Sequence, residues 1–161
     1  YLYFYRQQYG IDYVALRYAN VYGPRQNPHG EAGVVAIFTQ RMLGGDQPIV
    51  NGDGKQTRDY VYVGDVVRAN LAALDYDASG VFNVGTGVET NVNELFRTIR
   101  ELTGADIPEE HGPAKPGEQQ RSVLGYEKAK QTLGWSPEVD LGEGLRRTVE
   151  WFKKQGVRTE A

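Results

Sequence analysis

The sequence has no cysteine and only two histidines among its 161 residues. Without cysteine, the chain can form no disulfide, no thiolate zinc site and no cysteine nucleophile. The histidines, His29 and His111, lack the clustered spacing of metal ligands, so we expect no bound metal. The longest apolar run, Val34 to Phe38, is far shorter than the roughly 20 residues that span a bilayer, so we expect no membrane partner.

Basic charge is not in excess either, because 18 Lys and Arg oppose 21 Asp and Glu, a formal net charge of -3. Nucleic-acid-binding surfaces are usually strongly basic, so we expect no nucleic-acid partner. The N-terminal residues show no basic-then-apolar leader pattern, which predicts a soluble, cytoplasmic protein. Glycine is plentiful, with 20 residues, which predicts many tight turns.

The hydrophobic pattern alternates between the two-residue period of strands and the longer period of helices. It predicts strands at residues 13–19, 48–50, 57–63, 81–84 and 121–124, and helices at about 33–43, 65–74, 91–103, 127–133 and from 140 onward. Two of these helices open on capping pairs, Asn91 with Glu94 and Asp140 with Glu143. Strands that alternate with helices favour an α/β fold class.

The first nine residues have the pattern of a helix end. Leu2, Tyr5 and Tyr9 lie at helical spacing, Gly10 follows as a stop signal, and no capping residue precedes them. So short a helix is marginal by itself, because helix nucleation is unfavourable. We interpret the segment as the last turns of a helix that begins elsewhere, and we expect the chain to be cut at its start.

The run Gly85-Thr86-Gly87 follows a predicted strand and precedes a helix, as a dinucleotide-binding turn does. The third glycine of that fingerprint would fall on Thr90, however, and no acidic residue ends a second strand about 20 residues later. We therefore interpret the run as a tight turn between a strand and a helix.

Three scattered residues suit an anionic ligand. Arg58 follows a glycine-rich turn, Lys115 lies in a segment with proline and glycine, and Asn20 lies where a strand becomes a loop. A sugar diphosphate needs a planar guanidinium for its phosphate oxygens, a second cation, an amide donor, and a carboxylate for the ribose hydroxyls. Each residue also has an ordinary explanation: a surface ion pair of Arg58 with Asp59, an exposed lysine and a turn asparagine.

Four motifs follow one another along the chain: LRYANVYGP at 16–24, GDGKQTRDYVYVGDVV at 52–67, FNVGTG at 82–87 and KPGE at 115–118. In order and spacing they resemble the extended short-chain dehydrogenase/reductase family of nucleotide-sugar epimerases and dehydratases, and most closely bacterial UDP-glucose 4-epimerases. The resemblance covers essentially the whole chain, but only about the second half of such an enzyme. It implies a few strands of a Rossmann-type parallel sheet plus a small α/β substrate-binding lobe.

The resemblance implies that residues 1–161 form a single partial domain, the substrate-binding half, without the NAD-binding half. In the family, the first half supplies a glycine-rich NAD turn and a Tyr-x-x-x-Lys pair that acts as acid and base. Tyr1 and Tyr5 have no lysine four residues later, so we assign no catalytic residue and expect the chain to be inactive by itself. For the intact enzyme, the resemblance implies oxidation at C4 of a UDP-sugar by NAD, rotation of the 4-keto intermediate, and reduction on its other face.

The resemblance also implies roles for individual positions. It assigns Asn20 to the sugar phosphate, and Gly33, Val34 and Arg58 to the diphosphate. Ile49 and Asn51 are assigned to the base, and Ala19 to NAD. Lys115 is assigned to the basic end, and Glu118 to the ribose-binding end, of an Arg-x-Gly-Asp/Glu motif. Two positions depart from the family. Asn51 stands where an aromatic residue often stacks on the base, and Lys115 stands where arginine is usual, which replaces a forked donor by a point charge.

Two other functions stay open. The parent could be a sister enzyme, such as a nucleotide-sugar 4,6-dehydratase or a UDP-glucuronate epimerase or decarboxylase, or the chain could be a non-catalytic binding or dimerisation module. A UDP-sugar is the implied small-molecule partner, and we expect a homodimer for the intact enzyme. The strands at 13–19 and 81–84 would have unpaired edges, so we expect the chain alone to self-associate.

Overall fold

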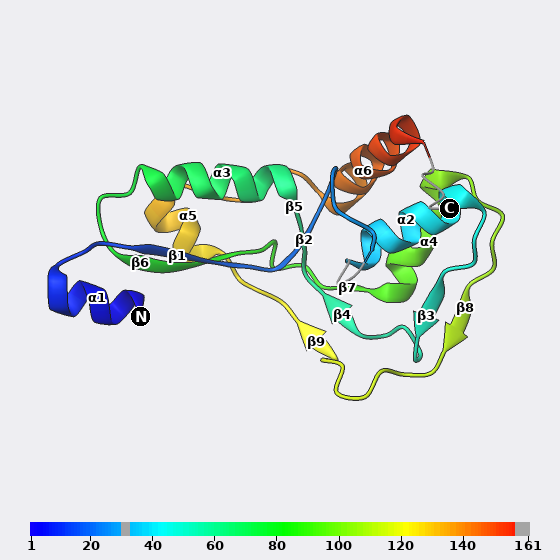
Figure 1. Cartoon of the computed structure of the whole chain (residues 1–161), viewed down its shortest axis with the longest axis horizontal. Coiled ribbons are helices and arrows are strands. Elements are labelled where there is room, and N and C mark those ends of the chain that lie inside the picture. The colour runs from blue at the N-terminus through cyan, green and yellow to red at the C-terminus, as the bar shows by residue number, and fades with distance from the viewer. Residues whose placement is uncertain (30–32, 157–161) are drawn as a thin grey trace.

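The computed structural model describes residues 1–29 and 33–156 and has the predicted α/β architecture (Figure 1). Its helices are α1 (Leu2–Tyr9), α2 (Val34–Gly44), α3 (Val63–Leu74), α4 (Val92–Thr103), α5 (Glu127–Leu133) and α6 (Leu141–Gln155). Its strands are β1 (Val14–Tyr18), β2 (Asn20–Tyr22), β3 (Ile49–Asn51), β4 (Thr57–Arg58), β5 (Tyr60–Tyr62), β6 (Gly80–Val84), β7 (Thr90–Asn91), β8 (Glu110–Gly112) and β9 (Arg121–Ser122). The pairs β1–β6, β2–β5, β3–β8 and β4–β9 are parallel, whereas β4–β7 is antiparallel.

The molecule is elongated and has a lobe at each end (Figure 1). In the first lobe, α3 and α5 lie against the β1–β6 pair, and the core is built around Phe82 and Trp135. In the second lobe, α2, α4 and α6 pack together beside the β3–β8 pair. Phe38 and Phe96 lie in the core of this lobe, with their rings 5.6 Å apart in an edge-to-face arrangement. The β2–β5 pair runs between the two lobes.

The predicted capping pairs explain where two helices of the second lobe begin. Asn91 accepts a 2.8 Å hydrogen bond from the Glu94 N–H, and the Glu94 carboxylate accepts one from the Asn91 N–H, which completes a capping box on α4. Asp140 likewise accepts from the Glu143 N–H at 2.8 Å at the start of α6. The Glu143 carboxylate pairs with Arg146 instead of returning to the cap.

Several predicted strand limits are wrong. The strand predicted at 57–63 is divided into β4 and β5, and the two pieces pair with different strands. The division falls at Asp59, because its side chain is buried against the loop that contains Thr86. The helix that follows begins at Val63, two residues before its predicted start. The strand predicted at 121–124 is limited to β9, and β8 lies in a segment for which the sequence predicts no strand.

Val67, Leu71 and Leu74 share one face of α3, as their helical spacing indicates, but this face is not buried. The three side chains are 54%, 56% and 80% exposed, and the helix buries Val66 and Ala69 instead. Such a row of exposed apolar side chains is typical of a contact surface. It is not a membrane span, since no helix in the described part of the chain is both long and apolar enough to cross a bilayer.

The strands predicted at 13–19 and 81–84 pair with each other as β1 and β6, so only their outer edges can be unpaired. Lys128 also donates from Nζ to the Val81 carbonyl of β6 at 3.0 Å. Within the described residues, β1 pairs with β6 alone and keeps one open edge. Self-association through that edge stays a prediction.

Candidate functional site

A cavity of about 420 Å³ opens in the second lobe, a volume in the range of small-molecule sites. Its lining residues are Asn20, Gly33, Val34, Ile37, Phe38, Arg41, Ile49, Asn51, Gln56, Arg58, Tyr60, Val92, Lys115 and Glu118. All eight residues that the family resemblance assigns to substrate binding are in this set. The fold therefore brings together positions that are separated by up to 98 residues (Asn20 to Glu118).

One face of α2 forms a wall of the cavity. Val34, Ile37 and Arg41 line it at i, i+3 and i+7, the spacing of a single helix face. Sequence reasoning assigned Val34 but missed Ile37 and Arg41, although this spacing was available as a signal. In β3, Ile49 and Asn51 alternate toward the same side, which is the two-residue period of a strand.

A second alternation runs through β4 and β5. Gln56, Arg58 and Tyr60 line the cavity at positions i, i+2 and i+4. Gln56 is buried, and its Nε2 donates to the Asn51 carbonyl at 3.1 Å, which ties this segment to β3. Gln56 and Tyr60 were missed from the sequence, but the two-residue period starting from Arg58 predicts both.

Asp59 points away from the cavity, and the surface ion pair considered for Arg58 and Asp59 is wrong. The Asp59 side chain is 1% exposed. Its carboxylate accepts hydrogen bonds from the Thr86 N–H and hydroxyl, the Gly87 N–H and the Leu124 N–H, at 2.6 to 3.2 Å. The amides of the turn at 85–87 therefore bind a carboxylate of the protein itself, as expected for a structural turn rather than a dinucleotide fingerprint.

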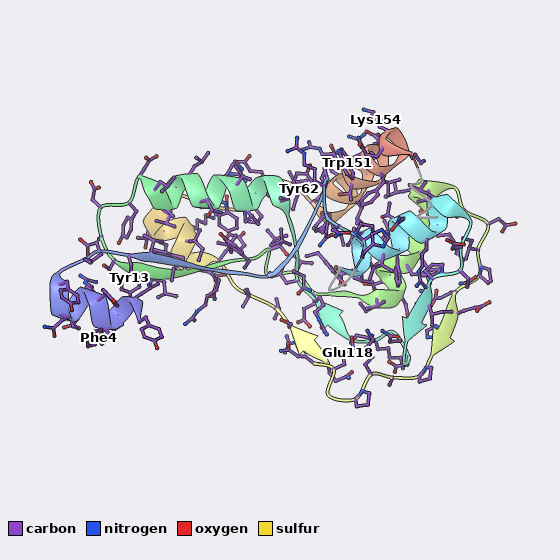
Figure 2. All side chains as sticks on the ribbon, in the orientation of Figure 1. Phe4, Tyr13, Tyr62, Glu118, Trp151 and Lys154 are labelled. Atoms are coloured by element: carbon purple, nitrogen blue, oxygen red, sulfur yellow. The ribbon has the colours of Figure 1, made fainter. Side chains whose placement is uncertain are left out.

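Arg58 pairs instead with Glu118 across the cavity. The Arg58 Nη2 lies 3.6 Å from the Glu118 Oε1, and the guanidinium also donates to the Thr57 carbonyl at 2.8 Å. Glu118 is presented by a turn in which its N–H donates to the Lys115 carbonyl at 3.2 Å and Gly117 has a φ of 76°. Proline followed by such a glycine is typical of a type II turn, which explains the Lys-Pro-Gly-Glu motif. Figure 2 shows Glu118 beside β9.

The N-terminus of α2 opens on the same cavity. Gly33 is its N-cap, no side chain among residues 1–29 and 33–156 caps the first turn, and both Gly33 and Val34 line the cavity. Free N–H groups and the helix dipole favour an anion at such a position. A Cβ atom on Gly33 would come within 2.6 Å of the Gln26 Nε2, so glycine allows this close approach.

The charges around the cavity favour an anionic ligand. Arg41, Arg58 and Lys115 contribute three cations, whereas Glu118 contributes one carboxylate. Asn20 adds a side-chain amide, and its backbone N–H donates to the Asp59 carbonyl at 2.8 Å, which holds β2 against β5. The arrangement can bind phosphate oxygens with the cations and the α2 amides, and can bind hydroxyl groups with Glu118.

One assigned residue, Ala19, and an unassigned Tyr-x-x-x-Lys spacing lie outside the cavity. Ala19 is half-buried and packs against the core of the first lobe, next to Asn20 but not in the lining. The sequence does contain one Tyr-x-x-x-Lys spacing, at Tyr126 and Lys130 of the α5 segment. The Tyr126 ring packs edge-to-face on Trp135 at 6.1 Å in the first lobe, and Tyr126 does not line the cavity.

Residues 1–85 match the model of a family described as the NAD dependent epimerase/dehydratase family. A UDP-glucose 4-epimerase from Mycolicibacterium smegmatis is 50% identical over 157 residues, which cover 96% of this chain and 50% of that protein. A crystal structure of UDP-glucose 4-epimerase with UDP-glucose from Thermotoga maritima is 55% identical, with a TM-score of 0.94 over 96% of this chain and 50% of that one.

A dTDP-glucose 4,6-dehydratase from an Actinoplanes species is 34% identical over 151 residues, which cover 92% of this chain and 46% of that protein. The chain thus spans about half the length of the relatives it matches. Its α/β fold with parallel strand pairs agrees with the epimerase structure over nearly all of its residues. The chain therefore belongs to the NAD-dependent epimerase/dehydratase family, as its four motifs predict.

Proposed function

We propose that this chain is the nucleotide-sugar-binding half of a UDP-glucose 4-epimerase, and that the 420 Å³ cavity takes the UDP-sugar. This proposal rests on the observation that all eight residues assigned by the resemblance line one cavity, whose described lining residues have an excess of positive charge. In this assignment Arg58, Asn20 and the first amides of α2 hold the diphosphate. Glu118 accepts hydrogen bonds from the ribose hydroxyls, and β3 lies beside the base.

Ala19 is the proposed neighbour of NAD. It follows β1 at the carboxyl end of two parallel strands, the edge at which open α/β sheets bind ligands. Its N–H donates to the Val84 carbonyl at 2.9 Å, which fixes the backbone of Ala19 at this edge. Its position next to Asn20 fits a cofactor placed beside the sugar. When bound, NAD supplies the hydride acceptor and donor for oxidation and reduction at C4.

We further propose that residues 1–161 act as one part of a two-part fold, with an NAD-binding half packed on the first lobe. The candidate contact surfaces are the open edge of β1, the exposed face of α3 and the unburied helix α1, and a hollow of about 440 Å³ lies between β1 and α3. Figure 2 shows Phe4 and Tyr13 at this end of the molecule, far from Glu118. In the chain alone, the same surface would drive self-association. A homodimer of the intact protein is a separate proposal, which rests on the family resemblance alone.

The alternatives are less well supported. Identity is 50–55% to the two epimerases and 34% to the dehydratase, which favours an epimerase parent. A purely structural dimerisation module does not need three cations and the N-terminus of α2 around one cavity, whereas an anion-binding protein does.

Binding without turnover is the expected result when the chain is mixed with NAD and UDP-galactose. Ligand-observed NMR should show saturation transfer to UDP-galactose that excess UDP abolishes. No UDP-glucose should form, because the only Tyr-x-x-x-Lys spacing, at Tyr126, lies outside the cavity. Absence of saturation transfer from the folded chain to UDP-galactose would contradict the binding role, and UDP-glucose formed above a blank would contradict the inactivity.

A further inference from the structure

The hydroxyl of Tyr60 stands out in the cavity wall. Across residues 1–29 and 33–156, four buried side-chain atoms lack a hydrogen-bond partner, and of these the Tyr60 hydroxyl oxygen belongs to a residue that lines the cavity. Tyr60 is only 5% exposed. A buried hydroxyl without a partner is unfavourable and rare in folded proteins, so it calls for an explanation. A group supplied by a ligand would be such an explanation.

The position of Tyr60 indicates which part of a ligand it would meet. It is in register with Asn20 on the parallel β2–β5 pair, so the two side chains emerge on the same face. It also follows Arg58 by two residues and lines the cavity together with it. Tyr60 is therefore a neighbour of both side chains that are assigned to the phosphate groups, and it lies on a different strand from Ile49 and Asn51, which are assigned to the base.

The chemistry of Tyr60 makes it a donor. Burial raises the pKa of its hydroxyl to about 12, while the Arg58 cation lowers it and the Glu118 carboxylate raises it. The hydroxyl is therefore neutral near pH 7 and able to donate. The Arg58 to Glu118 distance of 3.6 Å is longer than a hydrogen bond, so Arg58 is free to shift from Glu118 onto a phosphate.

We propose that Tyr60 is a further ligand-binding residue, whose hydroxyl donates a hydrogen bond to an oxygen of the diphosphate held by Arg58 and Asn20. This inference rests on the proposed function. The ligand class is a nucleoside diphosphate or its sugar ester, since the acceptor has to be an anionic oxygen beside the guanidinium. In the free chain the hydroxyl lacks a partner, and the bound diphosphate supplies one.

The test is Tyr60→Phe, with Tyr62→Phe as the matched control. Tyr62 lies on the same strand but outside the cavity, where its ring packs on Tyr22 at 5.9 Å. Calorimetry should show that Tyr60→Phe weakens UDP binding about tenfold or more, the range for a hydrogen bond to a charged group, and leaves uridine binding unchanged. Tyr62→Phe should change neither. The melting temperature of free Tyr60→Phe should not fall, because the hydroxyl makes no hydrogen bond there.

The outcomes separate two kinds of failure. If the wild-type chain binds UDP and Tyr60→Phe binds it equally well, the Tyr60 contact is wrong and the proposed function stands. Equal losses for UDP and uridine would also overturn the contact, because they would show a change of cavity shape. A fall in melting temperature would show a structural role for the hydroxyl. A folded wild-type chain that binds no UDP would overturn the proposed function together with this inference.

Discussion

Replacing Asp59 by alanine is expected to destabilise the chain by about 3–5 kcal/mol, the largest effect of any single substitution considered. The buried carboxylate is the common acceptor for Thr86, Gly87 and Leu124, which belong to two separate loops. Without it, these donors are left in the interior with no acceptor. Total stabilities of domains are only about 5–15 kcal/mol, so the variant should lie close to unfolding.

Urea unfolding, followed by the fluorescence of Trp135 and Trp151, measures this loss. Asp77→Ala is the control, because Asp77 is exposed and its removal should change the unfolding free energy by less than about 0.5 kcal/mol. Asp59→Asn keeps the shape and one acceptor oxygen, so it should lie between the wild type and Asp59→Ala. A loss below about 1 kcal/mol for Asp59→Ala would mean that the hydrogen-bond cluster does not hold the two loops together.

Arg58→Ala is expected to weaken the binding of UDP-sugars by about 1.5–3 kcal/mol, the range for hydrogen bonds to charged groups. That range corresponds to roughly a 10- to 150-fold rise in Kd. Arg58 is the cation that lies between the strand carrying Tyr60 and the turn carrying Glu118, and its side chain is 17% exposed. In a full-length relative, the same substitution should lower kcat/KM by a similar factor, since binding of the remote diphosphate positions the reacting sugar.

Arg121→Ala is the matched control for Arg58→Ala. Arg121 lies on β9, directly beside β4, but its guanidinium is 73% exposed and pairs with Glu89 at 2.6 Å, away from the cavity. The Arg121→Ala substitution removes the same charge as Arg58→Ala at a similar place in the fold. Because Arg121 does not line the cavity, the UDP-sugar affinity of this variant should stay within about twofold of wild type. Equal losses for the two variants would point to a general effect of charge, and no loss for Arg58→Ala would remove Arg58 from the site.

The residues assigned to substrate binding line one cavity, and their binding roles stay predictions, whereas several predicted strand limits are wrong. Asn20, Arg58 and Glu118 were found through motif order, and the fold places them in one cavity. Simple periodicity would have added Gln56 and Tyr60, because both lie an even number of residues from Arg58. The same period puts Asp59 on the opposite face from Arg58, and this is why their presumed ion pair does not form.

Other features depended on information that local patterns do not carry. The helical spacing of Val67, Leu71 and Leu74 agrees with α3, but their three side chains are exposed. Whether an apolar helix face is buried depends on what packs against it, which the spacing does not show. The break between β4 and β5 arises from hydrogen bonds of Asp59 to Thr86 and Leu124, which are 27 and 65 residues away. No window of neighbouring residues contains such contacts.

A preformed nucleotide-sugar site in this chain should be detectable by calorimetric titration of the wild-type chain with UDP, UDP-glucose and dTDP-glucose. We expect one site per chain that binds UDP and UDP-glucose, and weaker binding of dTDP-glucose, as suits an epimerase parent. A folded chain that binds none of the three would contradict a preformed site, and tighter binding of dTDP-glucose would favour the dehydratase alternative.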